Sequence, residues 1–202
     1  MFASTQNPVA KRHTVKQILA VPPKHLYNII LDVDSYSSFI PFCKSSQILR
    51  TSKCGTMFDA SLKIGFGQNG FMFQEEYVSR VTKNIQKVKH ENNTHDNDLL
   101  EWIVTAKSIK SKLFNNLNSS WKLTRVPFEG VSSVIPNLIN DHGSASSPKN
   151  RYDFMTNVEF EVEIFVSNPI ISTTLDVSLE EVAKQQVAAF EKRCYEIPFV
   201  EE

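Results

Sequence analysis

The sequence predicts an α+β fold in which a curved antiparallel sheet wraps around one long C-terminal helix. Residues 58–66 and 157–164 alternate apolar and polar side chains, as strands with one buried face do. Over residues 179–194 the apolar side chains instead recur three or four positions apart, which is the period of a helix. A sheet wrapped around a helix can leave an apolar space between the two, and we expect this space to hold a ligand.

The first quarter of the chain is predicted to form a strand, two short helical segments and a second strand. The first strand is expected at 13–20. Pro22 and Pro23 then open a helix, because proline is tolerated in the first helical turn. Pro41 ends a second, shorter helical turn. The second strand is expected at 44–50.

The middle of the chain supplies most of the predicted sheet. Asn69-Gly70 is a hairpin signal between two of its strands. Residues 128–152 lose all periodicity and are rich in Gly, Ser, Asn and Pro, so we interpret them as a long loop insertion. The further strands are predicted at 57–66, 71–82, 85–90, 99–106, 117–123 and 154–166.

The C-terminal helix has the clearest pattern in the sequence. Ser178 and Glu181 have the spacing of a capping box, which predicts that the helix begins at Ser178. Pro198 prevents the helix from continuing. We therefore expect one domain over residues 13–197, between a flexible N-terminus at 1–12 and a short tail at 198–202.

Composition excludes several classes of protein. The 22 basic and 22 acidic residues cancel, so no global field attracts nucleic acid. The three cysteines have no paired spacing, which argues against a disulfide framework. Residues 1–31 contain four basic residues and no acidic one, a composition typical of mitochondrial presequences, although a tail that is basic by chance would look the same.

Two motifs suggest chemistry that their context does not support. Residues 65–70 spell G-x-G-x-x-G, but the dinucleotide fingerprint requires a helix after it, and a strand is predicted there. Residues 90–98 are rich in His, Asp and Glu, yet they lack the spacing of a metal site, so a solvated loop is the better interpretation. We predict no metal site.

Three features are left open by residue-level reasoning. Glu75 is either a buried acid with a raised pKa, suited to acid–base chemistry, or a charge that pairs across strands. Trp121 is either solid core or the wall of a cavity. The turn at 39–42, beside Lys44, is either a mouth that grips a polar head group or a plain connection.

Several stretches together resemble a known family, the coenzyme-Q-binding START-domain proteins of mitochondria, which are relatives of polyketide cyclase/dehydrase-like lipid-transport domains. The most specific stretches are DVDSYSSFIPFC at 32–43 and VAKQQVAAFEKRC at 182–194. Residues 60–66, 76–82 and 160–165 match the family in the same order. Serines at 37 and 38 depart from the family pattern, which has a proline or a charged residue there.

The resemblance implies a helix-grip fold of the START/Bet v 1-like kind. It also implies that the cavity binds ubiquinone, or a late intermediate of its synthesis, and that the protein is a lipid carrier and not an enzyme, with no catalytic cofactor. The implied task is delivery of the quinone for respiration and support of its biosynthesis. The implied location is the matrix face of the inner mitochondrial membrane, as a peripheral protein working with ubiquinone-biosynthesis proteins.

The resemblance also implies a set of ligand-binding positions, and we add Phe71 and Phe160 to this set. A cyclase-like enzyme using the same cavity is the alternative function, with Glu75 as its acid or base, and an RNA- or ribosome-interacting protein is a third. The predicted ligand-binding residues are Pro41, Phe42, Lys44, Leu62, Ile64, Phe66, Phe71, Trp121, Phe160, Val182 and Phe190.

Overall fold

The computed structural model describes residues 10–68, 71–88, 99–127 and 154–199. The chain begins with strand β1 (Lys11–Leu19), helix α1 (Pro23–Leu31) and the short 3-10 helix η1 (Val33–Ser38). Six strands and a long helix follow: β2 (Cys43–Thr51), β3 (Met57–Gln68), β4 (Phe71–Val88), β5 (Leu99–Lys110), β6 (Asn116–Pro127), β7 (Phe154–Phe165) and α2 (Pro169–Glu196).

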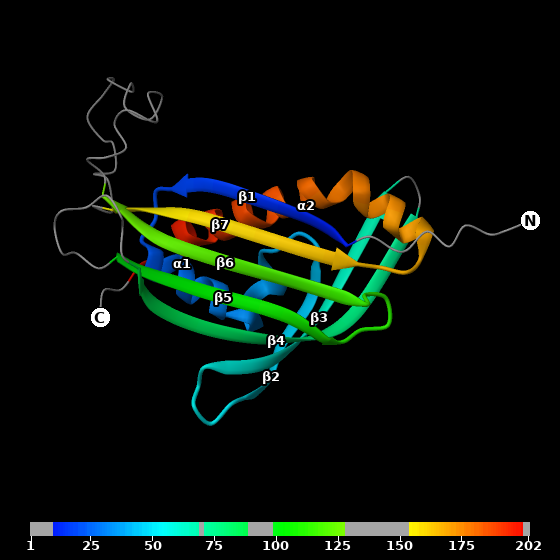
Figure 1. Cartoon of the computed structure of the whole chain (residues 1–202), viewed down its shortest axis with the longest axis horizontal. Helices are drawn as coiled ribbons and strands as arrows, with labels where there is room; N and C mark the ends of the chain where they lie inside the picture. The colour runs from blue at the N-terminus through cyan, green and yellow to red at the C-terminus, as the bar shows by residue number, and fades with distance from the viewer. Residues whose placement is uncertain (1–9, 69–70, 89–98, 128–153, 200–202) are drawn as a thin grey trace, which may run out of the picture.

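The seven strands form one antiparallel sheet in the order β1-β7-β6-β5-β4-β3-β2. From β2 to β7, consecutive strands pair with one another, and β1 pairs with the other edge of β7. The sheet curves around α2, and α1 lies on the same side of the sheet (Figure 1). The predicted α+β helix-grip architecture is confirmed.

The alternation in the sequence separates the two faces of the sheet. Phe58 and Ala60 are buried on the face toward α2, as is Phe160 on β7. On the outer face, the Asp59 carboxylate accepts hydrogen bonds from Arg50 Nε at 2.6 Å and Arg80 Nε at 2.9 Å. The apolar core therefore lies between the sheet and the helices, and this charged cluster lies on the outer face.

Helix α1 begins where the proline pair predicts and is tied to the end of α2. Pro22 is its N-cap and Pro23 its first residue, which suits proline because the first backbone amides of a helix have no intrahelical partner. The His25 ring lies with Nε2 3.0 Å from the carbonyl oxygen of Cys194 in α2. Together these contacts close one end of the space beneath the sheet.

Two predicted boundaries are wrong. The segment at 85–90 is not a separate strand, because β4 runs without a break from Phe71 to Val88 and pairs with β5 along its second half. Asn84, Ile85 and Gln86 are exposed, so both faces of this end of β4 meet solvent. The apolar alternation that marks a strand is therefore lost there although the backbone ladder continues.

The start of the last helix was also placed too late. Helix α2 begins at Pro169, so Ser178 lies inside it and is not its N-cap. Residues 170–174 are Ile and Ser/Thr types with weak helix propensity, which hid the first turns from the sequence pattern. Strand β1 likewise begins earlier than predicted, at Lys11. The predicted loops at 90–98 and 128–152 lie entirely outside the described residues.

Candidate functional site

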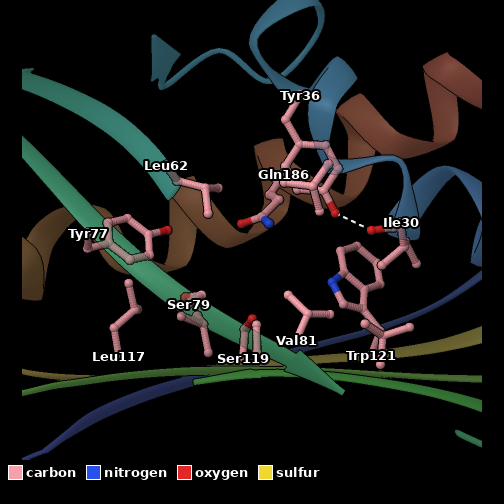
Figure 2. A pocket seen from close by; sticks show the side chains of 14 residues that line it. Ile30, Tyr36, Leu62, Tyr77, Ser79, Val81, Leu117, Ser119, Trp121 and Gln186 are labelled. Atoms are coloured by element: carbon pink, nitrogen blue, oxygen red, sulfur yellow. Dashed lines mark hydrogen bonds between the residues drawn. The ribbon is translucent and has the colours of Figure 1, made fainter. Parts of the chain in front are cut away.

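A hollow lies between the sheet and α2, in two adjoining compartments. The one that α1 helps to line, called the inner compartment, has a volume of about 110 Å³. Its lining comes from α1, η1, five strands and α2, so only the assembled fold creates it. The lining residues are Ile30, Val33, Tyr36, Leu62, Tyr77, Ser79, Val81, Val104, Ala106, Leu117, Ser119, Trp121, Val162 and Gln186 (Figure 2).

The second space, called the outer compartment, also has a volume of about 110 Å³. It shares six lining residues with the inner compartment, including Leu62 and Gln186, so the two spaces adjoin. Its lining residues are Tyr36, Ile40, Phe42, Cys43, Leu62, Ile64, Tyr77, Phe114, Leu117, Val162, Ile164, Leu179, Val182, Ala183 and Gln186.

The size of the two spaces limits what they can enclose. A cavity of about 150 Å³ lined by apolar side chains is known to take up benzene. Each compartment alone is smaller, at about 110 Å³, while the two together are larger. A single ring therefore needs space from both compartments, and the interior is too small for a long polyprenyl tail.

Five of the predicted ligand-binding residues line this interior. Leu62 lines both compartments, and Trp121 lines the inner one. Phe42, Ile64 and Val182 line the outer compartment. They come from β3, β6, α2 and the turn before β2, as the resemblance implied. Their contact with a ligand stays a prediction.

Phe160 and Phe190 lie behind the cavity wall and do not line either compartment. Both are fully buried, and their ring centroids are 4.4 Å and 5.0 Å from that of Trp121. This cluster fixes the indole ring against β7 and α2. Trp121 is thus part of the core on one side and part of the cavity wall on the other, so both interpretations of this residue hold.

The remaining predicted residues lie away from the compartments or outside the description. Pro41 is exposed. The side chain of Lys44 is exposed and lies over Gly65, on the sheet face that points away from α2, where its Cε is 3.3 Å from the position of a Cβ on Gly65. The side chains of Phe66 and Phe71 lie outside the described residues, although their backbones pair within β3 and β4.

Glu75 is buried, but its pKa is lowered. Its side chain is on the inner face, and Oε1 accepts hydrogen bonds from Ser111 Oγ at 2.6 Å and from the amides of Lys112 at 2.7 Å and Leu113 at 3.0 Å. Burial by itself would raise the pKa of Glu75, but the hydrogen bonds from Ser111 and these two amides outweigh it and leave the pKa below its ordinary value. The carboxylate stays ionised and holds the β5–β6 turn.

The sequence reasoning missed the polar groups inside the inner compartment. Tyr77, Ser79, Ser119 and Gln186 line it, and no hydrogen bond joins their side-chain polar atoms to the described part of the protein. Desolvation by burial raises the pKa of Tyr77, so its hydroxyl keeps its proton. The available signal was a glutamine within the otherwise apolar stripe of α2.

Other kinds of site find no support among the described residues. No group of three His, Cys, Asp or Glu side chains there could hold a metal ion. The Gly-rich motif at 65–70 is followed by β4, so the helix that a dinucleotide site requires is not there. No helix in the described ranges combines the length and apolarity needed to cross a membrane.

Comparison with protein families decides the affiliation. The model of the polyketide cyclase / dehydrase and lipid transport family matches residues 19–191. The chain belongs to this family. The match runs from the end of β1 almost to the end of α2, so it covers every element that lines the two compartments.

Within this family, the chain is similar to curated proteins named for coenzyme Q binding, which confirms the resemblance drawn from the sequence. The mitochondrial coenzyme Q-binding protein COQ10 of Dictyostelium discoideum is 33% identical over 82 residues, 39% of this chain and 38% of that protein. The COQ10 homolog B of Xenopus laevis is 26% identical over 181 residues, which are 90% of this chain and 57% of that protein. The COQ10 protein of Drosophila melanogaster is 28% identical over 139 residues, which are 67% of this chain and 54% of that protein. The matched region spans about half the length of these relatives, or less.

Solved structures of other proteins show the same fold. The Zhui aromatase/cyclase from Streptomyces sp. R1128 aligns with a TM-score of 0.59 at 9% identity, over 93% of this chain and 94% of that one. A START superfamily protein from Mycobacterium smegmatis aligns with a TM-score of 0.55 at 13% identity, over 94% and 99%. At these identities the likeness extends to the fold alone.

Proposed function

We propose that this protein binds coenzyme Q, or a late intermediate of its synthesis, in the hollow between the sheet and α2. The observation that carries the proposal is that hollow: two adjoining compartments beneath a seven-stranded sheet, lined mainly by apolar side chains. The similarity to proteins named for coenzyme Q binding supports coenzyme Q as the ligand.

Enclosing the ring and the first isoprene units has a clear driving force. Removing apolar surface from water is favourable by about 25 cal/mol for each Å². Leu62, Ile64 and Val182 offer apolar walls for this part of the ligand. Because the interior is too small for a whole tail, the distal isoprenes remain in a groove or in the bilayer.

The physiological task follows from the ligand. A carrier that encloses the ring and the first isoprene units of the quinone can deliver the quinone to the respiratory chain and to the proteins that complete its synthesis. We place this carrier in mitochondria, peripherally at the matrix side of the inner membrane. The relatives, which are named as mitochondrial proteins, and the basic composition of residues 1–31 support a mitochondrial location. Exposed lysines such as Lys24 and Lys44 each add about 1 kcal/mol of attraction near an anionic leaflet.

A cyclase-like enzyme remains the alternative, with Glu75 as its nominated acid or base. Glu75 is engaged by three donors of the β5–β6 turn, with a lowered pKa, whereas a general acid requires a carboxyl that keeps its proton. Glu75 also lines neither compartment, which does not favour it as a base for a substrate held there. The aromatase/cyclase neighbour shares the fold at 9% identity, which says nothing about its chemistry here.

The proposal is tested by extracting the purified protein with organic solvent and identifying the lipid by mass spectrometry. We expect a prenylated quinone, or its precursor, in the wild type. Leu62→Ala should lower the amount of quinone per folded molecule, because Leu62 lines both compartments. Leu49→Ala is the matched control, since Leu49 is half exposed on β2. Protein that contains no quinone, and that takes none up from quinone-loaded vesicles, would contradict the proposal.

A further inference from the structure

The two compartments differ in chemistry, and this difference gives the bound ligand a direction. The side chains found only in the outer compartment, such as Ile64, Phe114 and Leu179, contain no nitrogen or oxygen. Those found only in the inner compartment include the hydroxyls of Ser79 and Ser119. Polar lining is therefore concentrated at the end next to α1, and apolar lining at the end next to Ile40 and Phe42.

Two larger polar side chains lie where the compartments meet. Tyr77 on β4 and Gln186 on α2 line both spaces and point toward one another across the interior (Figure 2). Tyr36, the third polar residue they share, already donates its hydroxyl to the carbonyl oxygen of Ile30. The hydroxyl of Tyr77 and the carboxamide of Gln186 therefore remain free for a ligand, among the hydrogen bonds of the described residues.

Polar groups left unpaired in a protein interior are costly, and they are normally satisfied by a partner. Ser79 is only 4% exposed, and its side chain lines the inner compartment, where no described residue takes its hydroxyl as a hydrogen-bond partner and a ligand or water can reach it. With Tyr77, Ser119 and Gln186 it forms a set of four side chains that can all donate a hydrogen bond. A ring with carbonyl or methoxy oxygens would satisfy such a set, whereas a hydrocarbon tail would not.

On the basis of the proposed function, we propose that the inner compartment and its junction with the outer one form the head-group subsite: the quinone ring lies across the junction, with its oxygens accepting hydrogen bonds from Tyr77, Gln186, Ser79 and Ser119. The isoprenoid chain then leaves through the outer compartment, past Ile40 and Phe42, which are half-buried at its edge. In this orientation the tail, and not the head group, lies at the turn at 39–42, which is the reverse of the hypothesis that this turn grips the head group. Lys44 lies on the outer face of the sheet, away from the ring.

The subsite also makes a prediction about selectivity. A ligand that has the same tail as the quinone but no oxygen on its ring makes the same apolar contacts. It leaves the four donor side chains of the subsite without hydrogen-bond acceptors. The protein should therefore prefer oxygenated rings over plain ones, because unpaired buried donors disfavour the wrong ligand more than matched donors favour the right one.

The experiment compares two probes that share a ten-carbon alkyl tail, decylubiquinone and decylbenzene. Each is titrated against the lipid-stripped wild type and against Tyr77→Phe, Gln186→Leu and Ser79→Ala, and the retained probe is measured by extraction and mass spectrometry after gel filtration. We expect each variant to bind decylubiquinone about three- to tenfold more weakly, as the loss of one hydrogen bond implies, and decylbenzene no more weakly than the wild type does. Tyr195→Phe and Gln185→Leu are the matched controls, since Tyr195 is half exposed and Gln185 bonds to Glu181 on the outer side of α2.

The outcomes separate this inference from the proposed function. Variants that bind decylubiquinone as tightly as the wild type would overturn the inference and leave quinone binding intact; the four polar groups would then hold only water. Variants that lose both probes equally would show a role in shaping the cavity, which also overturns it. A wild type that retains decylbenzene and no decylubiquinone would overturn the proposed function itself, and the head-group subsite with it.

Discussion

The hydroxyl of Ser111 donates a hydrogen bond of 2.6 Å to the carboxylate of Glu75, and this contact fixes one wall of the ligand cavity. Ser111 Oγ also accepts the amide of Phe114 at 2.8 Å, so the turn between β5 and β6 is held at both ends. The ring of Phe114 then packs edge-on against Tyr77, with centroids 5.8 Å apart, and lines the outer compartment. A buried charge on β4 thus positions an aromatic wall that is distant in the sequence.

Replacing that charge should weaken the fold more than the binding site. Glu75→Gln weakens three hydrogen bonds to a buried carboxylate, and we expect the free energy of unfolding to fall by about 1–3 kcal/mol. Urea unfolding measures the loss. Quinone bound per folded molecule should stay near that of the wild type. If Glu75→Gln abolished turnover of a cyclisable substrate while leaving stability unchanged, the enzyme alternative would replace the carrier.

Stability should fall on acidification, in part through the same residue. The pKa values of Glu75 and Asp59 are both lowered in the folded protein. The stability they contribute is fully present above about pH 5, where the unfolded chain's carboxyls are ionised, and is lost as the pH falls through the lowered folded-state values. Between pH 7 and pH 3, the melting temperature of Glu75→Gln should decline less than that of the wild type, because only the contribution of Asp59 is then lost. Parallel curves for the variant and the wild type would contradict this.

Filling the cavity should separate binding from stability. Ala106 lines the inner compartment, so Ala106→Leu occupies part of the space meant for the ring. We expect less bound quinone together with a stability that is unchanged or raised by about 0.5–1 kcal/mol, as cavity filling usually gives. A solidly packed interior would instead lose about 1–3 kcal/mol from overpacking. Ala188→Leu, on the exposed side of α2, is the control.

The two tryptophans allow the ligand to be located by fluorescence. Trp121 lines the inner compartment, whereas Trp102 lies elsewhere in the core and lines neither space. Quinones quench indole fluorescence on contact. The Trp102→Phe variant keeps only Trp121, and the Trp121→Phe variant keeps only Trp102. Adding decylubiquinone should therefore quench the fluorescence of Trp102→Phe much more strongly than that of Trp121→Phe. Equal quenching of the two variants would place the ring outside the inner compartment.

Local pattern predicted much of this architecture. The alternation at 58–66 and 157–164 gave the faces of β3 and β7, and the proline pair gave the start of α1. It failed where the local signal and the tertiary environment disagree. The exposed end of β4 loses its alternation, and the first turns of α2 consist of residues with weak helix propensity.

The candidate site divides in the same way. Apolar lining residues such as Leu62 and Val182 could be named from their strand or helix face and from the family resemblance. Glu75 could not be assigned, because a buried acid and a structural anchor produce the same sequence pattern. Its role depends on a turn 36 residues further along the chain.

The order of apolar and polar residues by itself determined which side of the regularly alternating strands, such as β3 and β7, faces inward, because burial follows a local period. Whether the inward side chains meet or leave a hollow was decided only by the tertiary structure, since that depends on the curvature of the sheet and on how α2 is seated in it. The same packing brings Tyr77 and Gln186, which are more than a hundred residues apart, to the two sides of one cavity. Their juxtaposition has no local signature, because nothing in either neighbourhood of the chain encodes the other.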